Sequence, residues 1–164
     1  MQKHKSLRKA LINAVPQLRN NPDMLRLFAD NGHTDSRLAS SLSFEKVYVL
    51  NVVVTDFTGD LDLIFVPVQV WLREHQPDIM TTDDGREKGF TWMIDINNDD
   101  SLDISISLRL TERTLVKEVD GALHVKEVDG ALHVSYAPEP SLPEPVTRPV
   151  ELYVNGELVS KWDE

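Results

Sequence analysis

Apolar side chains near the start of the chain recur at helical spacing. Every third or fourth position is apolar over residues 7–18, which places these side chains on one face of a helix. The positions are Leu7, Leu11, Ala14 and Leu18. Ser6 is the predicted N-cap of this helix. Pro16 lies within the pattern and removes one helical hydrogen-bond donor, so we expect it to bend or split the helix there.

A second helix start signal follows at Asn21, with Pro22 at the first helical position and Asp23 in the first turn. An apolar stripe comes next, and Asn31-Gly32 is typical of a helix C-terminus. The stripe consists of Met24, Leu25, Leu27 and Phe28. We therefore expect the N-terminal part of the chain to form one broken helix or two short helices.

The stretch from Phe44 to Phe57 has a different character, because it is rich in valine, a strand former. Its middle is apolar on both faces, which is typical of a central strand that is covered on both sides. Residues 37–43 are the candidate partner strand. Residues 58–60 (Thr-Gly-Asp) then form a turn signal.

A buried helix is predicted after this turn. Asp60 or Asp62 can cap it, and we expect it to end at His75, before Pro77. Pro67 falls early enough to be tolerated in the first turns. The apolar positions are Leu63, Ile64, Val66, Val70 and Trp71. A strand is the alternative here, because valine is frequent in this segment.

Beyond Pro77 the pattern becomes mostly β. Residues 81–87 are a predicted polar loop, residues 89–96 a strand and residues 97–101 a turn. Residues 102–110 alternate almost perfectly between apolar and polar side chains. The apolar set is Leu102, Ile104, Ile106, Leu108 and Leu110. One buried face and one solvated face indicate an antiparallel sheet.

The segment Val116 to His124 is repeated without change as Val125 to His133. Each copy carries Asp-Gly between alternating apolar residues, which is a hairpin signal. The repeat has an odd number of residues, so a straight strand through both copies would turn its apolar side chains to the opposite face in the second copy. We therefore predict a second hairpin or a bulged loop.

Prolines concentrate between Pro138 and Pro149, which indicates a semi-rigid, extended linker. Residues 150–162 behind it are predicted to form a hairpin that turns at Asn155-Gly156. A two-stranded hairpin is marginal alone, so one that is apolar on both faces is expected to dock on its own domain or on a neighbour. Its candidate partner-binding residues are Val150, Leu152, Val154 and Val159 on one face and Tyr153, Leu158 and Trp162 on the other.

These elements together predict an α+β fold, in which N-terminal helices and one central helix pack on a mainly antiparallel sheet. We expect one domain over residues 1–135, a linker over residues 136–149 and a C-terminal β-hairpin arm over residues 150–164. Apolar residues make up 41% of the chain, which is sufficient for one hydrophobic core.

Composition narrows the classes of function. The chain of 164 residues contains no cysteine, so disulfides and thiolate metal sites are excluded and a cytoplasm is the expected compartment. The net charge of −10 repels phosphate and disfavours DNA binding. The longest apolar stretch, residues 61–72, is too short and too interrupted to span a bilayer, and the N-terminus lacks the apolar core of a signal peptide. We interpret the weak basic cluster as a solvated helix face: Lys3, Lys5, Arg8 and Lys9.

The sequence predicts no catalytic residue, no cofactor and no metal site. The histidines at positions 4, 33, 75, 124 and 133 form no i, i+4 pair. Residues 95–103 match the first three ligand positions of an EF-hand loop, but Asp100 replaces the required glycine and Ile106 replaces the bidentate glutamate. A polar β-turn is the better interpretation. Phe90, Trp92 and Trp71 are expected to fill the core. We therefore expect a non-enzymatic protein that works through protein-binding surfaces.

Several longer segments carry a family pattern, including Asn-Pro-Asp-Met-Leu-Arg at residues 21–26. The others are residues 41–46, 54–60, 76–82, 110–116, 145–149 and 152–164. In these segments the chain resembles the tail completion protein R (GpR) family of contractile-tailed temperate phages and prophages. The resemblance runs over nearly the whole chain, and none of its motifs is chemical. The repeat departs from the family, whose members are expected to carry a single copy of it.

The resemblance implies a structural role in late tail assembly. Family members are expected to cap the head-proximal end of the tail tube and sheath, to stop growth and to offer a surface to the head connector or a second tail completion protein. By analogy with tail terminators such as protein U of phage lambda, the resemblance implies a homo-oligomer in the form of a hexameric ring.

The partners expected from this role are other proteins, with no sequence-specific nucleic acid and no membrane. We expect the protein in the host cytoplasm during assembly and in the virion tail afterwards. The terminal hairpin is the candidate arm that joins copies by strand addition. The alternatives are another phage tail, baseplate or head–tail adaptor protein, a metal-dependent enzyme that uses residues 95–103, and a general α/β adaptor unrelated to phages.

Overall fold

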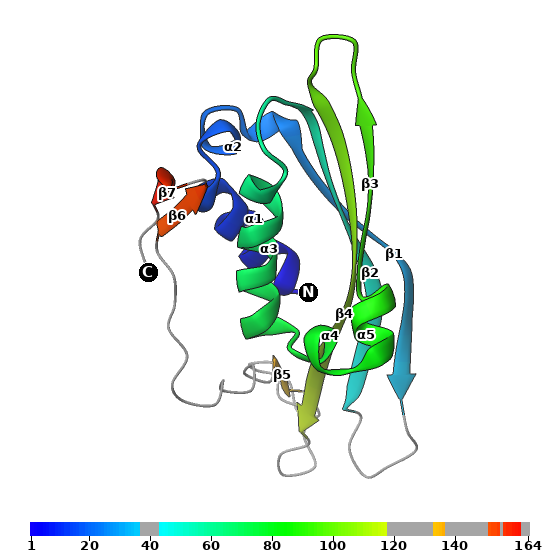
Figure 1. The fold of residues 1–164 in the computed structure, drawn as a ribbon. Helices are drawn as coiled ribbons and strands as arrows, with labels where there is room; N and C mark the ends of the chain where they lie inside the picture. Colours follow the sequence, from blue (N-terminus) through cyan, green and yellow to red (C-terminus); the bar gives the residue numbers. More distant parts are fainter. Residues whose placement is uncertain (37–42, 118–132, 137–150, 155, 162–164) are drawn as a thin grey trace.

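The computed structural model describes residues 1–36, 43–117, 133–136, 151–154 and 156–161. Two long helices, α1 (Lys3–Ala14) and α3 (Asp62–His75), lie side by side against one face of an antiparallel sheet (Figure 1). We call this face of the sheet the helix-side face and the opposite one the second face. The arrangement confirms the predicted α+β fold, with helices packed on an antiparallel sheet.

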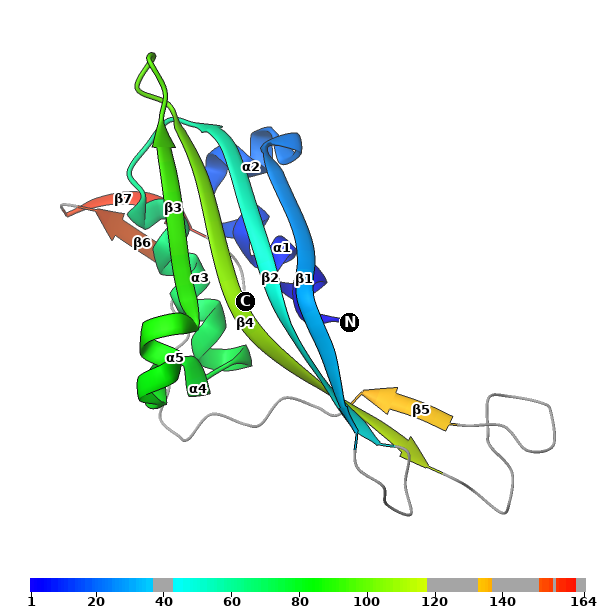
Figure 2. The same ribbon diagram turned by 90° about the vertical axis from the view of Figure 1, so that its right-hand side faces the viewer.

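The main sheet has the strand order β1 (Leu25–Ser36), β2 (Phe44–Phe57), β4 (Leu102–Lys117) and β3 (Phe90–Ile96) (Figure 2). A short strand, β5 (His133–Tyr136), pairs with the far end of β4. Every described pairing is antiparallel. The predicted strands at residues 44–57, 89–96 and 102–110 are confirmed, and β4 continues beyond its predicted end.

The core lies between the helices and the helix-side face. The alternation in β4 places one set of side chains there with almost no exposure to solvent: Ile104, Ile106, Leu108 and Leu110. The set from β2 is Tyr48, Leu50, Val52 and Val54. Burial of each aliphatic side chain stabilises the fold by roughly 1.5–3 kcal/mol. On the second face of β2, Val49 and Val53 are only half-buried, so this strand is central, as predicted, but fully covered on one face alone.

Pro16 splits the N-terminal helix as predicted, because α1 ends at Ala14 and a short helix, α2, spans Pro16–Asn20. The predicted apolar face is confirmed, since its members from Leu7 to Leu18 are all buried. The predicted N-cap at Ser6 is wrong, because α1 already begins at Lys3. The Ser6 hydroxyl instead accepts a hydrogen bond from Trp71 Nε1 at 3.0 Å and thereby ties α1 to α3.

The helix predicted to follow Asn21 is wrong. Residues Pro22–Met24 form only one turn of 3-10 helix, and β1 begins at Leu25. The apolar stripe fits either spacing, and pairing of Leu25 with Val54 in the buried β2 decides for a strand. Asn31-Gly32 is a bulge in β1 and not a helix stop: Asn31 has a φ of 47°, and the register shifts between Asp30 and His33.

The central helix α3 is confirmed between Asp62 and His75. The backbone N–H of Asp62 donates to Asp60 Oδ1 at 2.9 Å, so Asp60 satisfies one donor at the start of the helix. The polar loop predicted for residues 81–87 is wrong. Two short helices, α4 (Asp78–Thr81) and α5 (Asp83–Lys88), occupy this segment, because the Thr82 hydroxyl caps α5 by accepting from the N–H of Gly85 at 3.0 Å.

The predicted terminal hairpin is confirmed as β6 (Glu151–Val154) and β7 (Glu157–Lys161), which pair antiparallel. The hairpin lies on the side of the helices away from the main sheet (Figure 1). Residues 37–42 of the predicted strand at 37–43 and most of the repeat and the linker lie outside the described residues, and Ser43 is not part of a strand. None of the helices in the described residues is long and apolar enough to cross a membrane.

Candidate partner-binding surfaces

The terminal hairpin is docked on its own chain by one of its faces. Leu152 and Ser160 face each other across β6 and β7, and both are buried. The Ser160 hydroxyl donates a hydrogen bond to the carbonyl oxygen of Ala14, the last residue of α1. This carbonyl is one of those that a helix end leaves without an internal partner. The hairpin therefore supplies a hydrogen-bond donor to the backbone at the break between α1 and α2.

The other face of the hairpin is apolar and exposed. Tyr153 and Leu158 are partners across the two strands and are 55% and 51% exposed. The Tyr153 hydroxyl donates to Glu151 at 3.1 Å, and Lys161 binds the same carboxylate at 2.8 Å. Hydrogen bonds from Lys161 and Tyr153 hold the pKa of Glu151 below its ordinary value. Tyr153 and Leu158 thus form a small apolar surface with a polar rim.

The predicted partner-binding residues differ in their exposure. Tyr153 and Leu158 share the exposed face, as predicted, whereas Leu152 is turned inward. Val159 is half-buried and lies at a register shift between the strands. Val154 ends β6, and positions 150 and 162 lie outside the described residues.

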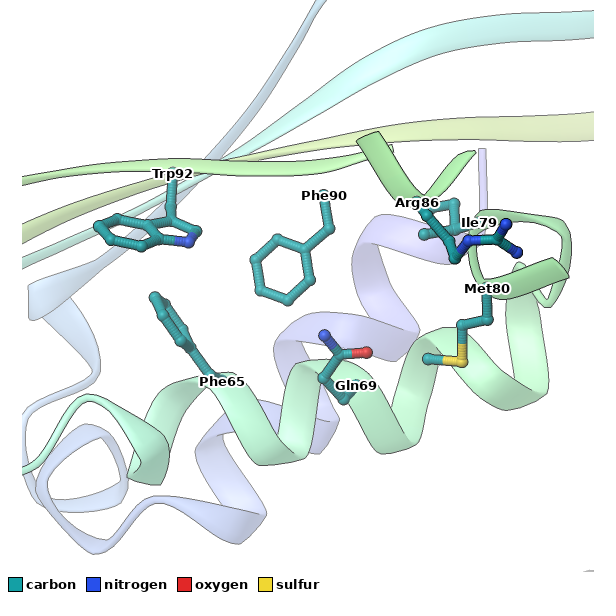
Figure 3. Close-up of a pocket in the computed structure, with 7 residues that line it drawn as sticks. All are labelled: Phe65, Gln69, Ile79, Met80, Arg86, Phe90 and Trp92. Carbon is teal, nitrogen blue, oxygen red and sulfur yellow. The ribbon is translucent and has the colours of Figure 1, made fainter. Parts of the chain in front are cut away.

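A second apolar surface lies along β3, an edge strand of the main sheet. Trp92 is 57% exposed and its ring lies 5.5 Å from that of Phe65 on α3. The Phe90 ring packs edge-on against Phe65 at 5.6 Å. These rings border a groove of about 320 Å³ between β3, α3 and the short helices α4 and α5 (Figure 3). Its lining residues are Phe65, Gln69, Ile79, Met80, Arg86, Phe90 and Trp92.

The prediction that all three large rings fill the core is wrong for Trp92. Trp71 is buried and Phe90 packs partly against the core, but Trp92 lies on an edge strand, where no further strand covers it. Met93 beside it is 65% exposed. The sequence carried a signal for this exposed apolar surface in the run Trp92-Met93-Ile94. A strand with one solvated face usually alternates between apolar and polar residues, so three apolar residues in succession place an apolar side chain on each face.

The acidic segment at residues 95–103 forms the polar turn that the sequence indicates. The N–H of Asn97 donates to the carbonyl oxygen of Ser101 at 2.8 Å. Asp99 accepts from the hydroxyl and the N–H of Ser101 at 2.7 and 3.1 Å, which holds the pKa of Asp99 below its ordinary value. Asp103 accepts from the N–H of Asp56. In the described part of the chain, no group of three or more His, Asp and Glu residues is arranged to hold a metal.

The basic residues near the N-terminus do not all lie on a solvated helix face. Lys5 and Lys9 are exposed, but Lys3 is buried, so the interpretation is wrong for Lys3. Its ammonium donates to the carbonyl oxygen of His75 and to Gln76 Oε1. The His75 ring stacks on Trp71. This basic side chain therefore joins α1 to the end of α3 and is not available to an acidic partner.

Glu112 on β4 is a buried carboxylate directed at the start of α1. Its Oε1 accepts from the N–H groups of Lys3 and Gln2 at 2.7 and 2.9 Å and from the Tyr48 hydroxyl at 3.1 Å. Its Oε2 lies 3.6 Å from the N-terminal ammonium. A negative charge at a helix N-terminus satisfies free N–H groups and opposes the helix dipole.

Two opposing effects act on the ionisation of Glu112. Burial opposes the charged form, but the hydrogen bonds from Lys3, Gln2 and Tyr48 and the N-terminal charge hold the pKa below its ordinary value. The group is therefore an ionised structural anchor between helix and sheet. Sequence spacing could not reveal it, because its partners lie far away in the sequence: Tyr48 is 64 positions away, and Lys3 and Gln2 are 109 and 110 positions away.

Comparison with known proteins agrees with the resemblance read from the sequence. The family model described as P2 phage tail completion protein R (GpR) matches residues 1–140. The chain is 68% identical, over 164 residues and the whole of both chains, to Tail completion protein R of Escherichia phage P2. No solved structure matches the chain. The chain therefore belongs to the P2 phage tail completion protein R (GpR) family.

Proposed function

We propose that this chain is a structural virion protein that completes the phage tail. It caps the head-proximal end of the tail tube and sheath and prepares that end for joining to the head. The observation that carries the proposal is the identity of 68% over the whole length of a protein named for tail completion. The role is non-enzymatic and needs surfaces that bind other proteins, which the hairpin and the β3 edge supply.

The proposed cap is a hexameric ring of identical copies. A closed ring needs head-to-tail contacts, in which two different surfaces of the chain meet. Its further partners are the tube and sheath proteins on one side and the head connector or a second tail completion protein on the other. Assembly takes place in the host cytoplasm, and the protein remains in the virion tail.

The outward face of the terminal hairpin is the proposed partner-binding surface. Tyr153 and Leu158 are about half exposed although they are large and apolar. Covering the exposed half of each would contribute roughly 1 kcal/mol. Leu152 anchors the hairpin from the other side, so the surface is held in place before a partner arrives. The remaining candidates are Val150, Val154, Val159 and Trp162.

The test replaces both outward residues in the full-length chain, as Tyr153→Ser with Leu158→Ser. The variant is expected to fold, because neither side chain is buried, and to fail to complete tails in a phage that lacks its own tail completion protein R. Infectious particles are counted, and tails are examined by electron microscopy. The control is Glu157→Ser, which changes an exposed polar residue of the same hairpin.

Overlong or unstable tails without heads are the expected phenotype. Normal numbers of complete particles would contradict the role given to the hairpin. Removal of residues 150–164 is the stronger variant and is expected to leave a folded chain that neither oligomerises nor completes tails, as light scattering and microscopy would show. Complete absence of tails from a phage without the protein would instead indicate a tube protein and would overturn the proposed function.

A further inference from the structure

The main sheet has two free edges in the described part of the chain. β1 forms one edge and β3 the other, with β2 and β4 between them. An edge strand presents unpaired N–H and C=O groups that can pair with a strand of another chain. Soluble proteins usually protect such edges with charges, prolines or a covering segment. β3 instead presents Trp92, Met93 and Ile96 to solvent.

Apolar side chains of the two edges lie on matching faces. Trp92 on β3 and Leu27 on β1 both point to the helix side, because they occupy one continuous row of paired residues across the sheet. Met93 on β3 and Phe28 on β1, which is 53% exposed, point to the second face. Each edge therefore exposes a large apolar side chain on the second face, and on the helix-side face Trp92 of β3 is 57% exposed and Leu27 of β1 half-buried.

The two edge strands also lie at the same level of the sheet and run in opposite directions, as antiparallel pairing requires. Phe28 pairs with Asn51, Asn51 with Ser107, and Ser107 with Thr91, so Phe28 and Thr91 lie at the same level on opposite edges. Three antiparallel steps make β1 and β3 run in opposite directions. A copy placed beside β3 by rotation alone would thus present its β1 antiparallel, which continues the sheet.

The positions of charged side chains and of neighbouring elements are compatible with the register that pairs Phe28 with Thr91. Arg26 would lie opposite Met93 and diagonal to Asp95, within reach of an ion pair, and all three point to the second face. α4 and α5 lie beside the Phe90 end of β3, and the bulge after Asp30 ends the regular part of β1 (Figure 2). Pairing is therefore confined to residues 25–29 against residues 90–94.

We propose that β1 of one copy adds to β3 of the next, so that the copies join edge to edge in a continuous antiparallel sheet. The inference rests on the ring of the proposed function and names the contact that closes it. The helix-side contact is Leu27 against Trp92, at the rim of the groove beside Phe65. The contact is head-to-tail, so in a closed ring every copy uses residues 25–29 of one edge and residues 90–94 of the other.

Disulfide cross-linking tests the contact cleanly, because the chain contains no cysteine. Thr91→Cys is combined in one chain with Phe28→Cys, and in further variants with Arg26→Cys or Asp30→Cys to sample register shifts of two residues. Within one chain the two edges are three strand spacings apart, about 14 Å, and two cysteines bond only when their Cα atoms lie within about 7 Å. Any cross-link therefore joins different copies.

The matched control combines Thr91→Cys with Ala29→Cys, which lies on the other face of β1. After oxidation, a non-reducing gel of at least one of the three face-matched variants is expected to show a ladder that ends at the ring size, and the control is expected to show none. A ladder from the control alone would overturn the inference. So would the absence of every ladder from proteins that light scattering shows to be assembled, although the proposed function would stand.

A second variant tests the apolar contact itself. Trp92→Lys is expected to abolish assembly at concentrations where the unmodified chain assembles, because it replaces the ring that contacts Leu27 of the next copy with a charged side chain. Trp92→Phe is expected to retain assembly, and Asn98→Lys, which adds the same charge at an exposed turn, is the control. Wild-type assembly by Trp92→Lys would overturn the edge contact. A wild-type chain that completes tails as a monomer would overturn the ring of the proposed function as well.

Discussion

Replacement of Glu112 tests the buried anchor between α1 and β4. Glu112→Gln keeps the shape of the side chain and one acceptor oxygen, but it removes the negative charge. The N–H groups of Lys3 and Gln2 then donate to a neutral oxygen, and the N-terminal ammonium at 3.6 Å loses its partner. Glu112→Ala removes the acceptor altogether and leaves the buried N–H of Lys3 unpaired.

The magnitude follows from the number of hydrogen bonds. A hydrogen bond to a charged group contributes about 1.5–3 kcal/mol and a neutral one about 0.5–1.5 kcal/mol, so each of the two backbone bonds of Glu112 weakens by roughly 1 kcal/mol. The favourable interaction with the dipole of α1 adds about 0.5 kcal/mol, and relief of carboxylate burial offsets part of the sum. We expect a loss of about 2 kcal/mol for Glu112→Gln and about 3–5 kcal/mol for Glu112→Ala.

The effect of pH has a definite sign. The pKa of Glu112 in the folded chain lies below its ordinary value near 4.5. The unfolded chain therefore takes up the proton first as pH falls, so the stabilisation by the ionised group is complete well above pH 4.5. It is lost as pH falls through the folded-state pKa. The difference in stability between the wild type and Glu112→Gln is consequently expected to shrink below pH 4.5.

Urea unfolding followed by circular dichroism at pH 7 and at several lower values measures this difference. The control is Glu87→Gln, which removes a carboxylate from the exposed surface of α5 and is expected to change stability by less than about 0.5 kcal/mol. The reasoning is refuted if Glu112→Gln is no less stable than the control at pH 7, or if its deficit is the same at every pH.

Three further predictions concern glycines and the hairpin. Gly85→Ala places a Cβ 2.6 Å from a backbone oxygen of α4 and is expected to lower the free energy of unfolding by about 1–3 kcal/mol. The control is Gly32→Ala, whose Cβ has its nearest neighbour at 3.6 Å and which is expected to lower it by under about 1 kcal/mol; thermal unfolding measures both. Gly156→Ala is expected to weaken the hairpin by about 1 kcal/mol through its φ of +85° alone, since no atom lies near; hydrogen exchange of β6 and β7 checks this. Ser160→Ala removes the hydrogen bond to Ala14 and is expected to weaken docking of the hairpin by about 1 kcal/mol. Proteolysis of the chain between the helices and the hairpin is then expected to be faster, and an unchanged cleavage rate would contradict the docking.

Local patterns predicted those elements for which the apolar spacing and the start and stop signals indicate the same secondary structure. The helix around Leu11, its break at Pro16, the helix ending at His75 and the alternating strand from Leu102 are all present. For the helix around Leu11 and the strand from Leu102 only one spacing places the apolar residues on one face, whereas the helix ending at His75 was also indicated by its end signals. The terminal hairpin was predictable for a similar reason, because Asn-Gly in the sequence at positions 155 and 156 is a strong hairpin signal.

β1 shows where local patterns fail. The apolar residues from Met24 to Phe28 fit a helix and a strand equally well, and a helix start signal precedes them. The decision came from residues far away in the sequence, since Leu25 and Leu27 pair with Val54 and Val52 of a strand that is already buried. Pairing with β2 satisfies backbone groups and covers apolar surface together, which outweighs a weak local preference.

The sequence by itself determined the class of the fold, the acidic charge of −10, the absence of cysteine and the family. Only the tertiary structure decided which side chains are free to bind partners. Trp92 was expected in the core and lies exposed on an edge strand, while Lys3 was expected in solvent and is buried. Exposure depends on which strand stands at the edge of the sheet and which helix end meets a distant side chain. Both depend on contacts across the whole chain, which side-chain spacing does not encode.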